Sequence, residues 1–188
     1  GKYIFDMGQN MVGWENLQIK NGKKGDTVIL RFAETLKPDG SLYTANLRGA
    51  EVTDRYVMKE GSQQWEPHFT YHGFRFVEIT GFPGKPELAD LTGKVVYDAL
   101  ETTGQFETSA PMINQIYHNA YWSIRGNYRG MPTDCPQRDE RMGWLGDRAV
   151  GSYGESFLFD NNTLYAKWLQ DIEDVQREDG SIPDVAPA

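Results

Sequence analysis

The residues that could do chemistry gather in one segment, residues 134–147, which reads Asp-Cys-Pro-Gln-Arg-Asp-Glu-Arg-Met-Gly-Trp-Leu-Gly-Asp. A carboxylic acid can protonate a leaving oxygen, while arginines and carboxylates can hydrogen-bond hydroxyl groups. The tryptophan adds an apolar face. Glycines and prolines in and beside the segment fix its backbone, which a solvated charged loop would not need. The segment therefore favours a site that holds and cleaves a sugar.

The elements expected before this segment are antiparallel strands. Over the first hundred residues apolar positions alternate with a period of two, and turn signals such as Asn21-Gly22 and Pro38-Asp39-Gly40 separate the runs. Short strands at this spacing indicate a β-sandwich. The expected strands cover residues 3–6, 12–19, 27–34, 52–58, 65–70, 73–80 and 91–98.

Helical spacing replaces the alternating pattern in the second half of the chain. The first helix is expected from an apolar stripe at Ile113, Ile116, Tyr117, Ala120, Tyr121 and Ile124. Ser109 is its expected N-cap, with Pro111 in the first turn. Further helices are expected at residues 148–159 and 163–178, the last ended by Gly180.

Strands followed by helices in separate blocks indicate two domains, and hence an α+β protein. We expect an antiparallel β-sandwich domain at residues 1–103 and a helical domain at residues 104–188, joined at a Thr-Thr-Gly link. The chain begins inside an expected strand and stops without a terminating element. We therefore expect it to be a piece of a longer protein.

Composition narrows the classes of partner. The 188 residues carry a net charge of −8, which argues against nucleic acid or an anionic membrane as a partner. A single cysteine excludes an internal disulfide, and the three histidines fit no metal-binding template, so no metal or cofactor is expected. No apolar run approaches the roughly 18 residues of a membrane span. The compartment stays open between the bacterial cytoplasm and the periplasm or exterior.

The segment at residues 134–147 resembles the catalytic signature of bacterial α-L-rhamnosidases, glycoside hydrolases that remove terminal L-rhamnose. Further blocks carry the same resemblance, at residues 31–36, 39–43, 46–48, 65–67, 69–75 and 179–184. The resemblance implies a β-sandwich followed by the first helices of an (α/α)6 barrel. It also implies hydrolysis with inversion by two carboxylates, acting on a rhamnose-containing glycoside or polysaccharide.

The resemblance assigns roles to five residues. Glu140 corresponds to the general acid, and the sugar-contacting positions correspond to Asp134, Arg138, Trp144 and Asp147. The partner general base of this family lies downstream of the present chain. The isolated chain is therefore expected to be inactive without the remainder of its parent chain.

Simpler interpretations exist for several of these residues. Asp147 could be the N-cap of the following helix, Asp134 could set an Asx-turn, and Arg138 could be an ion-pair partner. Cys135 is expected to be a small buried residue, because no histidine lies near it in sequence to activate the thiol.

Two other functions remain as alternatives. One is a noncatalytic carbohydrate-binding sandwich, and the other is a different (α/α)6 glycosidase. A binding sandwich would place its aromatic and amide side chains on strands, whereas the acids here cluster between expected helices. Two or three helices of a closed barrel would also leave apolar faces uncovered, so we expect the helical half to self-associate.

Overall fold

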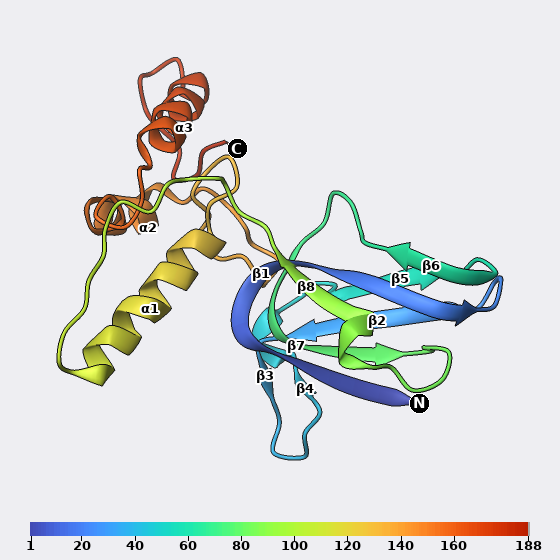
Figure 1. The fold of residues 1–188 in the computed structure, drawn as a ribbon. Coiled ribbons are helices and arrows are strands. Elements are labelled where there is room, and N and C mark those ends of the chain that lie inside the picture. Colours follow the sequence, from blue (N-terminus) through green and yellow to red (C-terminus); the bar gives the residue numbers. More distant parts are fainter. Residues whose placement is uncertain (188) are drawn as a thin grey trace. The chain divides into compact units, whose positions relative to one another are not determined.

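The computed structural model describes residues 1–187, which divide into two compact units (Figure 1). The first, here called the sheet unit, holds residues 1–96 together with residues 137–139. The second, here called the helical unit, holds residues 97–136 and the described residues from 140 onward. Strands and helices therefore segregate, as the α+β prediction requires.

Every strand pair that the structure describes in the sheet unit is antiparallel, which confirms the predicted β architecture. Its main sheet has the order β5-β2-β7-β1-β6, with β8 also paired to β1, and β3 pairs with β4 in a separate two-stranded sheet. The strands are β1 (Lys2–Gly22), β2 (Thr27–Ala33), β3 (Thr35–Leu36), β4 (Leu42–Tyr43), β5 (Thr53–Val57), β6 (Gly61–Trp65), β7 (His72–Thr80) and β8 (Leu91–Val95).

Strand β1 is continuous over 21 residues, where the sequence predicted two shorter strands. Its register against β7 shifts between Asp6 and Met11, and Gly8 adopts a positive φ of 77° within that irregularity. The Asp6 carboxylate accepts a hydrogen bond from the Gly8 N–H at 2.8 Å. A bulge of this kind interrupts the two-residue alternation without ending the strand, so the sequence pattern suggested a break.

The predicted strand at residues 65–70 is wrong. The strand is β6 at Gly61–Trp65, so it ends at the residue where the predicted strand began. Trp65 pairs with Leu17 of β1. Pro67 has no N–H to give a ladder, and Phe69 has a positive φ of 62°. Residues 62–64 of β6 are polar, so the sequence shows no apolar alternation there. The Gln63 side chain stabilises the turn before the strand by donating to the carbonyls of Lys59 and Gly61.

An ionisable cluster lies inside the sheet unit. His72 has a structural position: its Nε2 lies 3.0 Å from Asp54 Oδ1, and its ring stacks on Phe32 with centroids 4.0 Å apart. Glu15 of β1 is fully buried, and neither carboxyl oxygen has a hydrogen-bond partner among the described residues. Burial, with a smaller contribution from the charge of Asp54, raises the pKa of Glu15 to about 8.

The helical unit contains three α-helices: α1 (Pro111–Gly126), α2 (Leu145–Glu155) and α3 (Asn162–Asp174). The N-cap of α1 is Ala110 and not the predicted Ser109. Thr108 supplies the local hydrogen bonds at this end, because its hydroxyl accepts from the Ala110 N–H at 3.1 Å. None of the described helices is long and apolar enough to cross a membrane.

The other two helix predictions were misplaced at their ends. Helix α2 begins at Leu145 instead of residue 148, because the 143–145 backbone is held by the chain near residues 184–186. Helix α3 ends at Asp174. Gly180, with φ of 83°, closes a separate turn in which its N–H donates to the carbonyl of Arg177.

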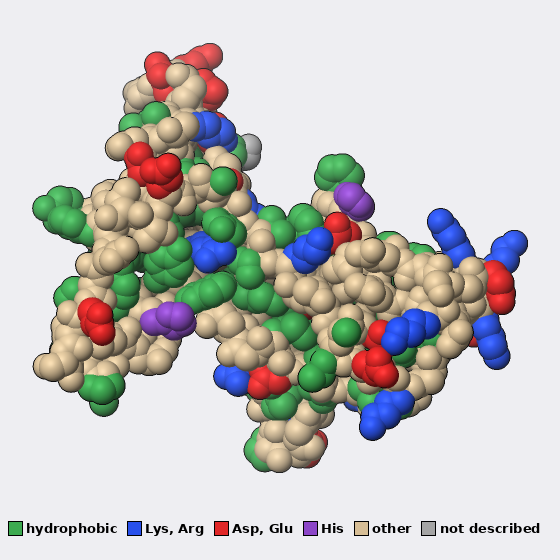
Figure 2. Space-filling view, viewed as in Figure 1, with side chains coloured by type: hydrophobic (Ala, Val, Ile, Leu, Met, Phe, Trp, Pro, Cys, Tyr) green, Lys and Arg blue, Asp and Glu red, His purple; other side chains and the backbone are tan. Residues whose placement is uncertain are grey.

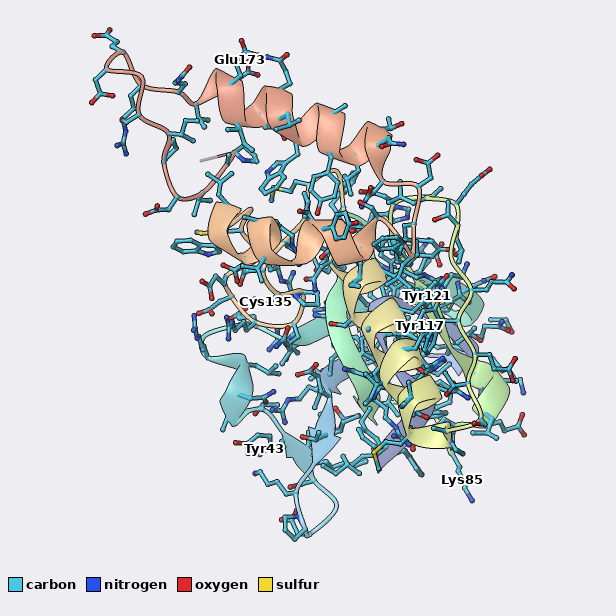
Figure 3. All side chains as sticks on the ribbon, turned by 90° about the vertical axis from the view of Figure 1, so that its left-hand side faces the viewer. Tyr43, Lys85, Tyr117, Tyr121, Cys135 and Glu173 are labelled. Atoms are coloured by element: carbon cyan, nitrogen blue, oxygen red, sulfur yellow. The ribbon has the colours of Figure 1, made fainter. Side chains whose placement is uncertain are left out.

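Only part of the apolar surface of the helical unit is covered. Its core joins Tyr128, Leu158, Phe159 and Leu164, with Tyr117 and Tyr121 of α1 packed against them (Figure 3). By contrast Ile116 is 61% exposed and Phe157 62% exposed, and both line an apolar pocket of about 600 Å³. Figure 2 shows hydrophobic side chains at the surface of this unit. Uncovered apolar area on the helices was predicted.

Candidate active site

The residue predicted as general acid lies in a loop closed at its base. We call residues 134–142 the Glu140 loop. The Asp134 N–H donates to the Met142 carbonyl at 2.9 Å, and the Met142 N–H donates to Asp134 Oδ1 at 2.8 Å. Asp134 therefore fixes both ends of the loop, and Glu140 is half-buried two residues before Met142.

Asp134 and Glu140 are brought together. Single ligand atoms of Asp134, Cys135 and Glu140 all lie within 4.8 Å of one another. This separation is shorter than the roughly 6.5–9.5 Å between the two carboxyl groups of an inverting glycosidase. Asp134 and Glu140 are therefore not spaced as the acid and base of such an enzyme. Cys135 is buried and not in a disulfide, as predicted (Figure 3).

The backbone beside the candidate acid is in an unusual conformation. Arg141 has a φ of 56°, in the left-handed region that residues other than glycine rarely occupy. Such positions cluster at functional sites, where the surrounding structure maintains the strain. Arg141 follows Glu140 directly, so this turn sets the direction of the chain that carries the carboxyl group.

Arg138 lies in the part of the loop that belongs to the sheet unit. Its neighbour Asp139 accepts a hydrogen bond from the Gly49 N–H at 3.1 Å. Its other neighbour, Gln137, packs on Gly73, where an added Cβ would lie 2.6 Å from the Gln137 Cβ. Arg138 itself is half-buried. Its neighbours on both sides contact other residues of the sheet unit.

Trp144 and Asp147 lie at the start of α2. Trp144 is the N-cap residue and bridges to Val185, and its indole Nε1 is buried without a hydrogen-bond partner among the described residues. Asp147 is not the N-cap: it is exposed, in the first helical turn. There its carboxylate still interacts favourably with the helix dipole.

A buried ionic network behind the loop was not found by sequence reasoning. Arg148 of α2 donates from one guanidinium nitrogen to Glu155 Oε1 and from the other to the Thr133 carbonyl. Glu155 Oε2 accepts from the hydroxyls of Tyr128, at 2.5 Å, and Tyr165, at 2.8 Å. Arg148 and Glu155 are 8% and 4% exposed.

The tyrosines of this network stay protonated. Burial, followed by hydrogen bonding to Glu155, raises the pKa of both hydroxyls well above the usual value. They therefore remain donors to the carboxylate across the ordinary pH range. The one signal in the sequence is the spacing of Arg148 and Glu155, seven residues apart and so on one face of a helix.

The chain resembles known proteins over its whole length. The model of the bacterial alpha-L-rhamnosidase concanavalin-like domain matches residues 1–97, and that of the bacterial alpha-L-rhamnosidase 6 hairpin glycosidase domain matches residues 101–188. An alpha-L-rhamnosidase of Streptomyces avermitilis is 48% identical over all of this chain and 18% of its own length. One of Formosa agariphila is 46% identical over 98% of this chain and 20% of its own length.

Solved structures agree with these matches. The alpha-L-rhamnosidase from Dictyoglumus thermophilum superimposes with a TM-score of 0.97 at 46% identity, over all of this chain and 21% of that one. The Streptomyces avermitilis alpha-L-rhamnosidase complexed with L-rhamnose gives a TM-score of 0.96, over all of this chain and 18% of that one. The present chain thus spans about a fifth of the length of these relatives.

Proposed function

The chain belongs to the bacterial α-L-rhamnosidase family, and from that premise we propose that it supplies the general acid of an inverting α-L-rhamnosidase. Glu140 is the acid. The observation that carries the proposal is its position, half-buried in a loop whose base is closed by Asp134 and Met142. A protein 48% identical to this chain binds L-rhamnose in its crystal structure.

In the proposed reaction the Glu140 carboxyl group donates its proton to the glycosidic oxygen as the bond to the anomeric carbon breaks. The aglycone leaves as a neutral alcohol. A water molecule attacks the opposite face of the sugar, and a carboxylate base takes its proton, which gives L-rhamnose of inverted configuration. As the resemblance to the rhamnosidase family implies, the base in this proposal belongs to a part of the enzyme outside this chain, and Asp134 does not take that role.

The remaining predicted residues hold the sugar in this proposal. The Trp144 indole offers an apolar face for ring hydrogens and the C6 methyl group. Asp134, Asp147 and Arg138 accept from and donate to ring hydroxyls. The substrate is a rhamnose-containing glycoside or polysaccharide.

One observation favours a second mechanism. One carboxyl oxygen of Asp134 lies within 4.8 Å of one carboxyl oxygen of Glu140, which is compatible with the roughly 5–5.5 Å between the carboxyl groups of retaining glycosidases. In that case Asp134 would attack the anomeric carbon and form a glycosyl ester, which water then hydrolyses. Against this, Asp134 Oδ1 already accepts the hydrogen bond that closes the loop. Inversion is therefore the preferred mechanism.

Hydrolysis of an aryl α-L-rhamnoside by the full-length enzyme tests the proposal. Glu140→Gln should lower kcat by about 10²–10⁴-fold, as expected for loss of a general acid. The control Glu173→Gln, at an exposed position of α3, should retain the wild-type rate (Figure 3). If neither enzyme cleaves the rhamnoside, a noncatalytic carbohydrate-binding role is favoured.

Proton NMR of the first sugar released separates the two mechanisms. Inversion gives β-L-rhamnose first, before mutarotation, and retention gives α-L-rhamnose. A first product of α configuration would reject the inverting proposal and assign Asp134 as the nucleophile.

A further inference from the structure

The Arg148 guanidinium joins two groups that lie far apart in sequence. One nitrogen donates to the buried Glu155 carboxylate, and another donates to the backbone carbonyl of Thr133. A guanidinium can make both bonds at once because its donors form a rigid planar fork. Thr133 directly precedes Asp134, so this fork holds the backbone at the entrance to the Glu140 loop.

The connection from Thr133 to the acid is short. The Thr133 N–H and hydroxyl both donate to the Asn127 carbonyl, and the hydroxyl also lies 2.9 Å from Asn127 Oδ1. The next residue, Asp134, makes the two hydrogen bonds with Met142 that close the loop. A shift of Thr133 therefore displaces the base of the loop, and Glu140 with it.

The far end of the fork is fixed as well. Both oxygens of Glu155 are used, one by Arg148 and the other by the hydroxyls of Tyr128 and Tyr165. A buried ion pair adds little net stability, because desolvation offsets the Coulomb attraction. Added stability is thus a weak explanation for the network. A role as rigid support for the Glu140 loop, in contrast, accounts for each of the network's hydrogen bonds.

We infer that Arg148 and Glu155 are positioning residues for Glu140, acting through the Thr133 carbonyl and the base of the loop. The inference rests on the proposed role of Glu140 as the acid. Neither residue needs to touch the substrate. A loop that moves by a fraction of an ångström misaligns proton transfer to the leaving oxygen, a step that depends on the position of Glu140 more steeply than hydrogen bonds to the sugar do.

The test uses two rhamnosides in the full-length enzyme, one with an activated nitrophenyl leaving group and one with a poor alkyl leaving group. The alkyl group needs the proton from the acid, and the nitrophenyl group needs it far less. The ratio of kcat/KM on the two substrates does not depend on how much enzyme is folded. A variant that is merely less stable leaves this ratio unchanged.

Two variants weaken the network in different ways. Arg148→Lys keeps the charge beside Glu155 but removes the fork, and Tyr165→Phe removes one hydrogen bond to Glu155 and leaves the ion pair. The matched controls are Arg177→Lys and Tyr153→Phe, both at exposed positions. Tyr165→Phe provides the measurement if Arg148→Lys does not fold.

For Arg148→Lys the alkyl-to-nitrophenyl ratio should fall at least about tenfold, since misplacement by 1 Å can cost about 10²-fold. KM should change less than about threefold. Tyr165→Phe should lower the ratio in the same direction by a smaller factor, and the controls should match wild type. A ratio equal to wild type in both network variants overturns the inference.

Glu140→Gln in the same assay separates the two claims. If it lowers the ratio while the network variants do not, the acid is established and the positioning role is rejected. If Glu140→Gln leaves the ratio at the wild-type value, the proposed function itself fails, and the positioning inference fails with it.

Discussion

Replacing Glu15 by glutamine should change how the stability of the sheet unit depends on pH. The Glu15 side chain is fully buried, and no described residue hydrogen-bonds to its carboxyl oxygens. The charged group that acts on it is Asp54 of β5, which is itself paired with His72 of β7. Both influences, burial and the nearby negative charge, favour the neutral acid, and the pKa of Glu15 is raised to about 8.

The sign of the effect follows from proton binding. Glu15 keeps its proton in the folded chain up to about pH 8 but loses it near pH 4.5 in the unfolded chain. Between these values the folded state binds one more proton, so the free energy of unfolding falls as pH rises. Each pH unit in this interval lowers the free energy of unfolding by about 1.4 kcal/mol, which amounts to on the order of 5 kcal/mol in total.

Glu15→Gln has nearly the same shape and carries no charge at any pH. Its stability relative to wild type should therefore rise by on the order of 3–5 kcal/mol between pH 4.5 and pH 8. The buried amide adds a constant offset, because its extra N–H donors lack partners at every pH. The pH dependence of the difference, and not its absolute value, is the prediction.

Urea unfolding followed by tryptophan fluorescence, at intervals from pH 4.5 to pH 9, measures this difference. Trp14 lies next to Glu15 in β1 and reports on the sheet unit. The control Glu51→Gln, at an exposed residue, should differ from wild type by the same amount at every pH. A flat difference for Glu15→Gln would refute the reasoning, as would a wild-type chain that gains stability from pH 5 to pH 8 relative to the variant.

Three further predictions concern packing. Gly73→Ala should lower the free energy of unfolding in urea by about 1–3 kcal/mol, because the added Cβ would lie 2.6 Å from the Gln137 Cβ. A loss below about 0.5 kcal/mol would show that the Glu140 loop moves to make room for the methyl group. Trp168→Phe should lower the free energy of unfolding by about 1–2 kcal/mol, because it leaves the Ala186 carbonyl without the 2.7 Å indole hydrogen bond. An unchanged unfolding midpoint would count against that bond. Ile116→Glu should reduce self-association of the isolated chain in sedimentation velocity, because the residue is 61% exposed on the uncovered apolar face of α1; a wild-type chain that is already monomeric would contradict this.

The sequence predicted the architecture because period-two and helical spacing are properties of single segments. It failed where distant contacts decide the outcome. The bulge in β1 depends on pairing with β7, and the start of α2 depends on hydrogen bonds between residues 143–145 and 184–186. Strand β6 is held by its ladder to β1, and its residues 62–64 are polar, so they show no apolar alternation.

The candidate site was partly predictable for the same reason. A contiguous signature named Asp134 and Glu140, and the structure brings them together. The support behind them was not predictable, because Thr133, Tyr128 and Tyr165 meet Arg148 and Glu155 only when the helices pack. Charged residues on a helix are most often solvated, so nothing in the sequence predicted that this pair would be buried.

The central claim, that Glu140 delivers the proton to the leaving group, is tested most directly by the leaving-group dependence of Glu140→Gln. The rates of wild type and variant are compared across a series of aryl α-L-rhamnosides of decreasing leaving-group acidity. We predict that the variant loses little on the most activated substrate and progressively more, up to about 10⁴-fold, on the poorest. An equal loss on every substrate would contradict the claim and assign Glu140 to binding or folding.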